Sequence, residues 1–277
     1  MNYDPKTKKF PYPEDTSSHY IDITMDRGLI FDKNYPYLEK SFPFRFKRFW
    51  VRFLLVILVF PVARIRMGIG IKGKSVFKRY KYLLKDGAIT VANHVHFWDY
   101  ICVMKALHHN RWPNVIVWDK NINGKDGPLM RLVGGIPIPV NDNEATLAFI
   151  SSLEELFKEK GWLHIYPEGS MWEYYRPIRP FKTGAAAFAI KYDKPIIPMA
   201  FTYRKPNALR RKLFKQIALF DLHIGEPLFV NKDLPKTKQL EDLTIRLHDA
   251  VRKLAGLSVE DNFYPQIYNN SKRVDYY

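Results

Sequence analysis

The feature that most restricts the fold is a regular alternation of strand-like and helix-like segments between residues 88 and 202. Such alternation is typical of parallel strands joined by helices, so the predicted class is α/β, with a single domain whose mostly parallel central sheet is flanked by helices. At 277 residues and 47% apolar content, the chain can bury one substantial core. The strand-like segments lie near 88–92, 114–118, 136–140, 162–166 and 196–202, and the helical patterns lie near 97–109, 127–133, 144–160 and 182–192.

The rest of the chain divides by composition. Residues 216–230 predict a pair of late strands, and residues 237–256 have the pattern of an amphipathic helix. The expected divisions are an extended N-terminal arm at 1–42, a short membrane-associating helical segment at 43–70, the α/β domain at 71–235, and a C-terminal helix and tail at 236–277.

The charge distribution predicts an anionic partner. The formal net charge is +16, from 44 Lys and Arg against 28 Asp and Glu. Ten of the basic residues lie within 41–80, where there is no acidic residue, and they flank the apolar run 53–63. This run is too short to cross a bilayer, but it suits a position in one leaflet or at the headgroup boundary. A buried core helix is the alternative interpretation.

The expected location is the cytoplasmic face of a membrane, with the protein peripheral or monotopic on an anionic surface. The apolar run does not fit a signal peptide, because a long polar stretch precedes it and no small-residue cleavage site follows it. A second basic tract at 204–215 predicts either a solvated loop or a second contact with anionic headgroups.

The cysteine and histidine content favours neither a disulfide nor a metal site. The single cysteine, Cys102, falls on the apolar side of a predicted helix, which favours a small buried hydrophobe over a nucleophile. His108 and His109 have no companions at metal-ligand spacing, so no metal is expected. His164 lies within a predicted strand and is interpreted as structural.

A histidine and an aspartate five residues apart predict a catalytic dyad. His94 follows the predicted strand 88–92, and Asp99 lies in the first turn of the helix after it. The turn between them can bring the carboxylate onto the imidazole, which suits proton abstraction from a substrate hydroxyl. A structural His and Asp pair is the alternative. His96 is expected to point to the opposite side of the turn.

A second polar cluster follows a later strand. Residues 163–166 predict a strand, and Glu168, Gly169 and Ser170 occupy the turn after it. Polar groups at the ends of two strands are what an active site at the rim of an open sheet requires.

These motifs resemble those of the glycerolipid acyltransferases, the family that includes 1-acylglycerol-3-phosphate acyltransferase. His94 and Asp99 match its H-x4-D motif, and residues 168–170 match its E-G-[ST] motif. Three further blocks follow in the order of the family, namely Gly134–Ile138, Phe181–Ala185 and Pro195–Met199.

The resemblance implies a reaction and roles for the motif residues. A fatty acyl group would pass from acyl-CoA or acyl carrier protein to the hydroxyl of a lysolipid, by default lysophosphatidic acid. His94 would take the proton from that hydroxyl, and Asp99 would orient His94. Glu168, Gly169 and Ser170 would bind the acceptor head group. No permanently bound cofactor is implied.

The sequence departs from the family at two arginine positions. The Gly-rich block normally continues to an arginine associated with the phosphate of the acceptor, but Val140 stands there, and Met171 follows the E-G-[ST] motif where an arginine is common. Candidates to replace the missing cation are Lys120, Arg176, Arg179 and Lys182.

Two other functions stay open at this level. The acceptor could be a lysolipid without a phosphate monoester. From another class, the charge and the interspersed aromatic residues also fit a basic nucleic-acid-binding or lipid-binding protein without catalysis, although this explains none of the ordered motifs.

Overall fold

The computed structural model describes residues 12, 13, 15–19, 23 and 25–257. Within these residues the core is a seven-stranded sheet in the order β1-β7-β6-β2-β5-β3-β4. Neighbouring strands are parallel except for β6 and β7, which are antiparallel. The predicted α/β class with a mostly parallel sheet is therefore confirmed. The strands are β1 Gly70–Lys72, β2 Ala88–Val91, β3 Pro113–Trp118, β4 Gly135–Ile138, β5 Trp162–Ile165, β6 Ile196–Arg204 and β7 Leu219–Ile224.

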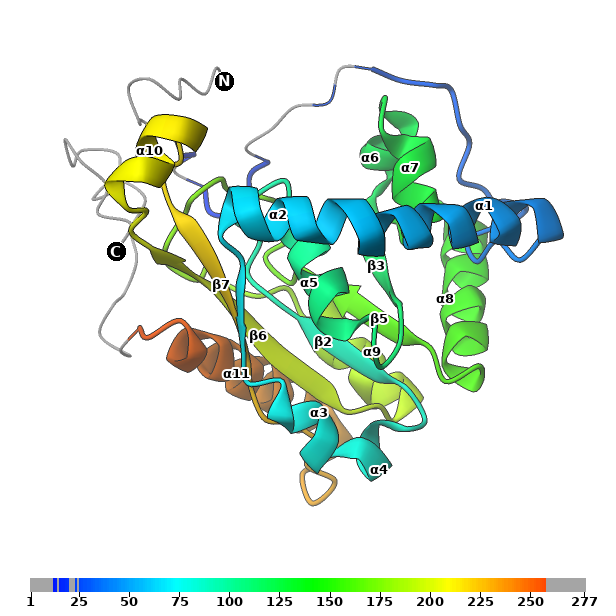
Figure 1. Cartoon of the computed structure of the whole chain (residues 1–277). Coiled ribbons are helices and arrows are strands. Elements are labelled where there is room, and N and C mark those ends of the chain that lie inside the picture. Colours follow the sequence, from blue (N-terminus) through cyan, green and yellow to red (C-terminus); the bar gives the residue numbers. More distant parts are fainter. Residues whose placement is uncertain (1–11, 14, 20–22, 24, 258–277) are drawn as a thin grey trace.

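Helices cover both faces of this sheet (Figure 1). One core cluster packs α3 and α5 on one face, and a second packs α8, α9 and α11 on the other. The helices are α1 Phe42–Leu54, the π-helical η1 Leu55–Val59, α2 Phe60–Met67, α3 Ser75–Arg79, α4 Lys81–Leu84, α5 Asp99–Leu107, α6 Asp119–Asn123, α7 Gly127–Leu132, α8 Asn143–Lys158, α9 Gly184–Tyr192, α10 Ala208–Phe214 and α11 Lys236–Leu254.

The predictions for the C-terminal part are confirmed for the helix and wrong for one strand. Leu243, Leu247 and Val251 of α11 are buried against the sheet. Of the expected pair of strands at 216–230, β7 forms, whereas Leu228 makes only an isolated bridge to Ile196. Pro227, directly before Leu228, has no N–H to offer a ladder, which accounts for the missing strand. The predicted tail at 258–277 lies outside the described residues.

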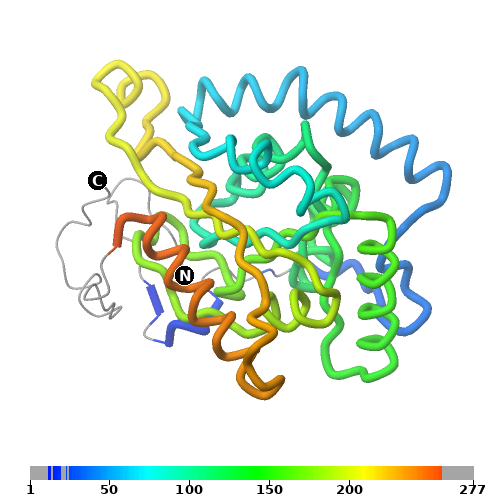
Figure 2. The backbone as a smooth tube through the Cα atoms, turned by 90° about the horizontal axis from the view of Figure 1, so that it is seen from below, coloured from blue at the N-terminus to red at the C-terminus, as the bar shows by residue number. Residues whose placement is uncertain are grey.

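The basic and apolar segment forms one continuous rod of α1, η1 and α2 that crosses α5 (Figure 1). Figure 2 shows the rod at one surface of the molecule and α11 at the opposite one. The π-helical turn comes just before Pro61, whose ring and missing N–H disrupt regular α-helical bonding. Within the described residues, no helix has both the length and the apolar composition that crossing a bilayer requires.

The apolar run has one buried face and one exposed face. Leu55 and Phe60 are buried in a small cluster with Met104 of α5. The outward face is exposed and apolar. It comprises Phe42, Phe46, Phe49, Trp50, Phe53, Leu54, Val56, Ile57, Leu58, Val62 and Ile65.

The described part of the N-terminal arm is pinned to the domain. Asn123 at the end of α6 accepts a hydrogen bond from the Leu29 N–H (2.8 Å) and donates one to the Leu29 carbonyl (3.2 Å). Farther along, the buried Arg131 donates from Nη1 to the Tyr37 carbonyl (2.9 Å) and to the Gly135 carbonyl (2.8 Å). The arm therefore follows the surface of the α/β domain on its way to α1.

Candidate active site

The turn that carries the first motif is fixed by a buried asparagine. Asn93 follows β2, and its side chain forms two hydrogen bonds with the main chain of Phe201 on β6. The Phe201 N–H donates to Oδ1 at 2.7 Å, and Nδ2 donates to the Phe201 carbonyl at 3.3 Å. These two hydrogen bonds hold the chain at the end of β2 and so fix the position of His94, the next residue.

His94 and Asp99 are in direct contact, as their spacing predicts. Asp99 is the first residue of α5, and its Oδ2 lies 2.7 Å from His94 Nδ1. Oδ2 also accepts the Val95 N–H at 3.1 Å, so the turn and the helix start are closed around one carboxylate. Because an ionised carboxylate only accepts, Nδ1 carries the proton and Nε2 is left as the basic nitrogen.

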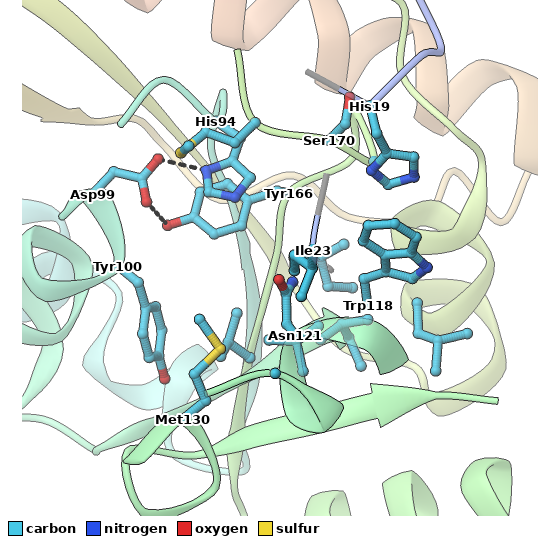
Figure 3. Close-up of a pocket in the computed structure, with 18 of the residues that line it drawn as sticks. His19, Ile23, His94, Asp99, Tyr100, Trp118, Asn121, Met130, Tyr166 and Ser170 are labelled. Carbon is cyan, nitrogen blue, oxygen red and sulfur yellow. Dashed lines mark hydrogen bonds and ion pairs between the residues drawn. The ribbon is translucent and has the colours of Figure 1, made fainter. Parts of the chain in front are cut away.

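Tyr166, the residue directly after β5, completes this arrangement. Its hydroxyl donates to Asp99 Oδ1 at 2.8 Å, and its ring stacks on His94 with centroids 3.9 Å apart and planes at 12° (Figure 3). Burial alone would raise the pKa of Asp99, but the nearby His94 and the hydrogen bonds from His94, Tyr166 and Val95 lower it overall. Burial raises the pKa of the Tyr166 hydroxyl, which keeps it protonated as a donor.

The other histidines near this site lie away from the reacting side. His96 points toward Phe220 and Tyr174, and burial lowers its pKa to about 4. His164 is buried, and its Nδ1 lies 2.8 Å from Thr90 Oγ1. Among the described residues, no group of His, Cys, Asp and Glu is arranged to hold a metal ion.

The E-G-S turn contains a buried ion pair. Glu168 and Arg179 are 3% and 1% exposed, and Arg179 Nη2 lies 3.0 Å from Glu168 Oε2. The same carboxylate accepts the His94 N–H at 3.1 Å and the Arg179 N–H at 2.9 Å. Arg179 also donates from Nη1 to Ser170 Oγ at 2.7 Å. This network joins the two motifs, because Glu168 binds the main-chain N–H of His94.

Gly169 at the centre of this turn is required by its surroundings. Its φ is +78°, in the left-handed region that favours glycine. A Cβ there would also lie 2.7 Å from Lys182 Nζ. The turn therefore admits the lysine side chain along its main chain.

A largely apolar cavity of about 770 Å³ opens beside His94. Its size lies within the range of small-molecule sites. Gly169, Ser170 and Lys182 line it together with the dyad. Apolar side chains on its wall include Ile116, Met130, Val133, Ile138, Phe149 and Phe188.

The expected substrate-binding residues divide between the cavity and the protein interior. Gly169, Ser170 and Lys182 line the cavity, whereas Glu168 and Arg179 form a buried ion pair with each other. Lys120 Nζ lies over the Trp118 ring at 4.8 Å from its centroid. Val140 and Met171, at the two arginine positions of the family, both line the cavity, and neither brings charge to it. Lys120, Arg176 and Arg179 are not on the cavity wall.

Most of the α/β domain matches a known protein family. The model of a family described as Acyltransferase matches residues 69–202. These residues are an acyltransferase domain. The match confirms the predicted family and enzyme class, and it favours an enzyme over the nucleic-acid-binding alternative.

A solved structure similar to this chain is the 1-acyl-sn-glycerophosphate (LPA) acyltransferase PlsC from Thermotoga maritima. The TM-score is 0.45 at 16% sequence identity, and the match covers 81% of this chain and 86% of that one. No match was found among curated proteins.

Some residues of the acyltransferase site were not predicted from the sequence. Tyr166 directly precedes the Pro-Glu-Gly run, but its contact with Asp99 spans 67 residues, so spacing gave no signal. His19 and Ile23 of the arm line the cavity, although the arm has no periodicity to place it. Trp118, the last residue of β3, lines the same cavity. It was not predicted because the signal for a site is a polar group at a strand end, and Trp118 is an aromatic residue.

Proposed function

We propose that this protein transfers a fatty acyl group from a thioester donor to the hydroxyl of a lysolipid at a membrane surface. The acceptor is 1-acyl-sn-glycerol-3-phosphate, the product is phosphatidic acid, and the donor is acyl-CoA or acyl carrier protein. The observation that carries the proposal is the 2.7 Å contact of His94 with Asp99 on the wall of an apolar cavity.

The site supports a mechanism in which the substrate, and not the protein, is the nucleophile. The Ser170 hydroxyl is occupied, because it donates to the Ser18 carbonyl and accepts from Arg179. Cys102 is buried, and burial raises the pKa of its thiol, so it is not a thiolate at neutral pH. His94 is thus the group suited to activate an external hydroxyl.

His94 Nε2 takes the proton of the acceptor hydroxyl as the oxygen bonds to the carbonyl carbon of the thioester. Asp99 stabilises the imidazolium that forms, and Tyr166 holds Asp99 in place. The tetrahedral intermediate then collapses, the carbon–sulfur bond breaks, and the leaving thiolate takes the proton from His94. The apolar cavity would hold an acyl chain.

The exposed apolar face of the rod supports membrane attachment. Soluble monomers rarely expose a continuous apolar surface of this kind, and helices with aromatic and basic flanks bind at the headgroup boundary. α10 extends this surface, because Arg210 Nη1 donates to the Ile65 carbonyl at 2.8 Å, while Leu209 and Leu213 are exposed. This favours the 204–215 tract as a second headgroup contact.

A neutral or zwitterionic lysolipid is a second candidate acceptor. It is favoured by Val140 and Met171, which present uncharged surface to the cavity at the arginine positions of the family.

Lipid mass spectrometry tests the proposal. The purified full chain is incubated in detergent micelles with an isotope-labelled donor, either acyl-CoA or acylated acyl carrier protein. Each donor is combined with one acceptor at a time: lysophosphatidic acid, lysophosphatidylcholine or monoacylglycerol. Labelled phosphatidic acid is the expected product. Product from the neutral or zwitterionic acceptors alone would favour the second candidate, and no labelled lipid from a folded protein would contradict acyl transfer.

A further inference from the structure

The N-terminal arm is anchored on the E-G-S turn itself. The Ser18 carbonyl accepts hydrogen bonds from Ser170 Oγ at 3.0 Å and from Trp172 Nε1 at 2.9 Å. The Thr16 carbonyl accepts from Arg179 Nη1 at 3.1 Å. Three side chains of the motif region therefore hold two carbonyl groups of the arm, and the next residue, after Ser18, lies at the cavity.

That next residue, His19, lines the cavity. Its ring stacks on Trp118 at the end of β3, with centroids 4.0 Å apart and planes at 18°. Figure 3 shows the ring beside Trp118 and close to Ser170. The position of His19 is thus fixed by its main chain on one side and by its ring on the other.

Positive charge converges at this end of the cavity. The pKa of His19 is lowered by partial burial and by the charges of Lys182, Lys120 and Arg179. Arg179 is neutralised by Glu168, but within the described part of the chain neither lysine forms an ion pair with a carboxylate. An anion bound here would relieve the mutual repulsion and could accept hydrogen bonds from His19 and Lys182.

We infer that His19 and Lys182 together bind a phosphate group of a substrate, so that the arm supplies a ligand where Val140 and Met171 leave the cavity uncharged. The inference rests on the proposed function and adds a specificity residue to it. The phosphate belongs either to the acceptor lipid or to the coenzyme A moiety of the donor, and both present the same chemistry to an imidazole and an ammonium group.

Four variants of the full chain separate anion binding from packing. His19→Ala removes the ring, whereas His19→Phe keeps a ring to stack on Trp118 but offers no N–H. His19→Lys supplies an N–H donor with a positive charge but without the ring. Ser17→Ala is the matched control, because the Ser17 side chain is exposed on the same arm and, among the residues that the structure describes, its hydroxyl bonds to Asp15.

Steady-state kinetics in mixed micelles give the readout. KM is measured for lysophosphatidic acid against monoacylglycerol, and for acyl-CoA against acyl-pantetheine, which lacks the nucleotide phosphates. His19→Ala and His19→Phe should raise KM about tenfold for one phosphate-bearing substrate, as expected for a lost hydrogen bond to a charged group. In the same variants KM for the phosphate-free partner and kcat should change less than about twofold, and His19→Lys should recover most of the loss. The substrate whose KM rises identifies the source of the phosphate.

Two results would overturn the inference. One is recovery of the normal KM in His19→Phe, which would make the ring a packing element. The other is a KM change that is absent or equal for substrates with and without phosphate. If the unsubstituted protein acylates no lysolipid at all, the proposed function fails instead, and the two failures are therefore distinguishable.

Discussion

Replacing Arg179 with methionine tests how the two motifs are held together. The guanidinium pairs with Glu168 and donates to Ser170 in the protein interior, and it also donates to the Thr16 carbonyl in a partly buried bond. Methionine fills a similar space without charge. Glu168, 3% exposed, would keep only the main-chain donors of His94 and of residue 179. A buried carboxylate would then lack its counter-charge.

The expected loss follows from that contact set. Removing one partner of a buried ion pair costs about 3–5 kcal/mol in the free energy of unfolding. For a chain of this size, that corresponds to a fall in Tm of roughly 6–20 °C. Thermal and urea unfolding in detergent, followed by circular dichroism, measure both quantities.

Two companion variants make the test specific. Glu168→Gln combined with Arg179→Met removes both charges. The free energy of unfolding of this double variant should therefore be at least about 1.5 kcal/mol higher than that of Arg179→Met alone. Lys158→Met is the control, because its ion pair with Glu154 is exposed and screened by solvent, so its loss should leave the free energy of unfolding nearly unchanged. An Arg179→Met protein within about 1 kcal/mol of the unsubstituted one would refute the reasoning.

Three further predictions concern the dyad, the membrane face and the cavity. Tyr166→Phe removes a hydrogen bond that lowers the pKa of Asp99. The ionised carboxylate stabilises the folded protein above its unfolded pKa, and this stability is lost as pH falls through the folded pKa, so acid unfolding of the variant should begin at higher pH. At neutral pH the free energy of unfolding should fall by about 1.5–3 kcal/mol. No shift in the acid midpoint would count against the assigned contact. Ile57→Asp, at an exposed position, should release the protein from vesicles in a flotation assay without unfolding it, whereas Leu55→Asp should lower Tm; the reverse pattern would contradict the assignment of faces. Ile116→Trp should fill part of the cavity and shift preference from long to short acyl-CoA in a competition assay, and an unchanged preference would remove the cavity as the acyl site.

Local sequence was sufficient for the dyad. His94 and Asp99 are five residues apart, and the strand before them and the helix after them leave a turn short enough to force the contact. The stripe of α11 was equally visible, because helical spacing places its leucines on one face. Both features depend on chain geometry over a few residues.

Contacts between distant segments were not visible in the same way. The sequence suggested Glu168 and Arg179 as ligands for the acceptor, but nothing in it signalled that they would neutralise each other within the interior. Similarly, His19 reaches the site because Ser170 and Trp172 bind the carbonyl before it and its ring stacks on Trp118. Such placements follow from the tertiary fold, which a single sequence does not reveal.

The central claim is that His94 activates the hydroxyl of the acceptor, and the turnover of His94→Ala tests it most directly. Phosphatidic acid formation from labelled acyl-CoA is measured with both proteins at matched concentration, after unfolding curves have shown that the variant is folded. Loss of the general base should lower kcat by roughly 100-fold to 10,000-fold. Full activity in a folded His94→Ala protein would contradict the mechanism.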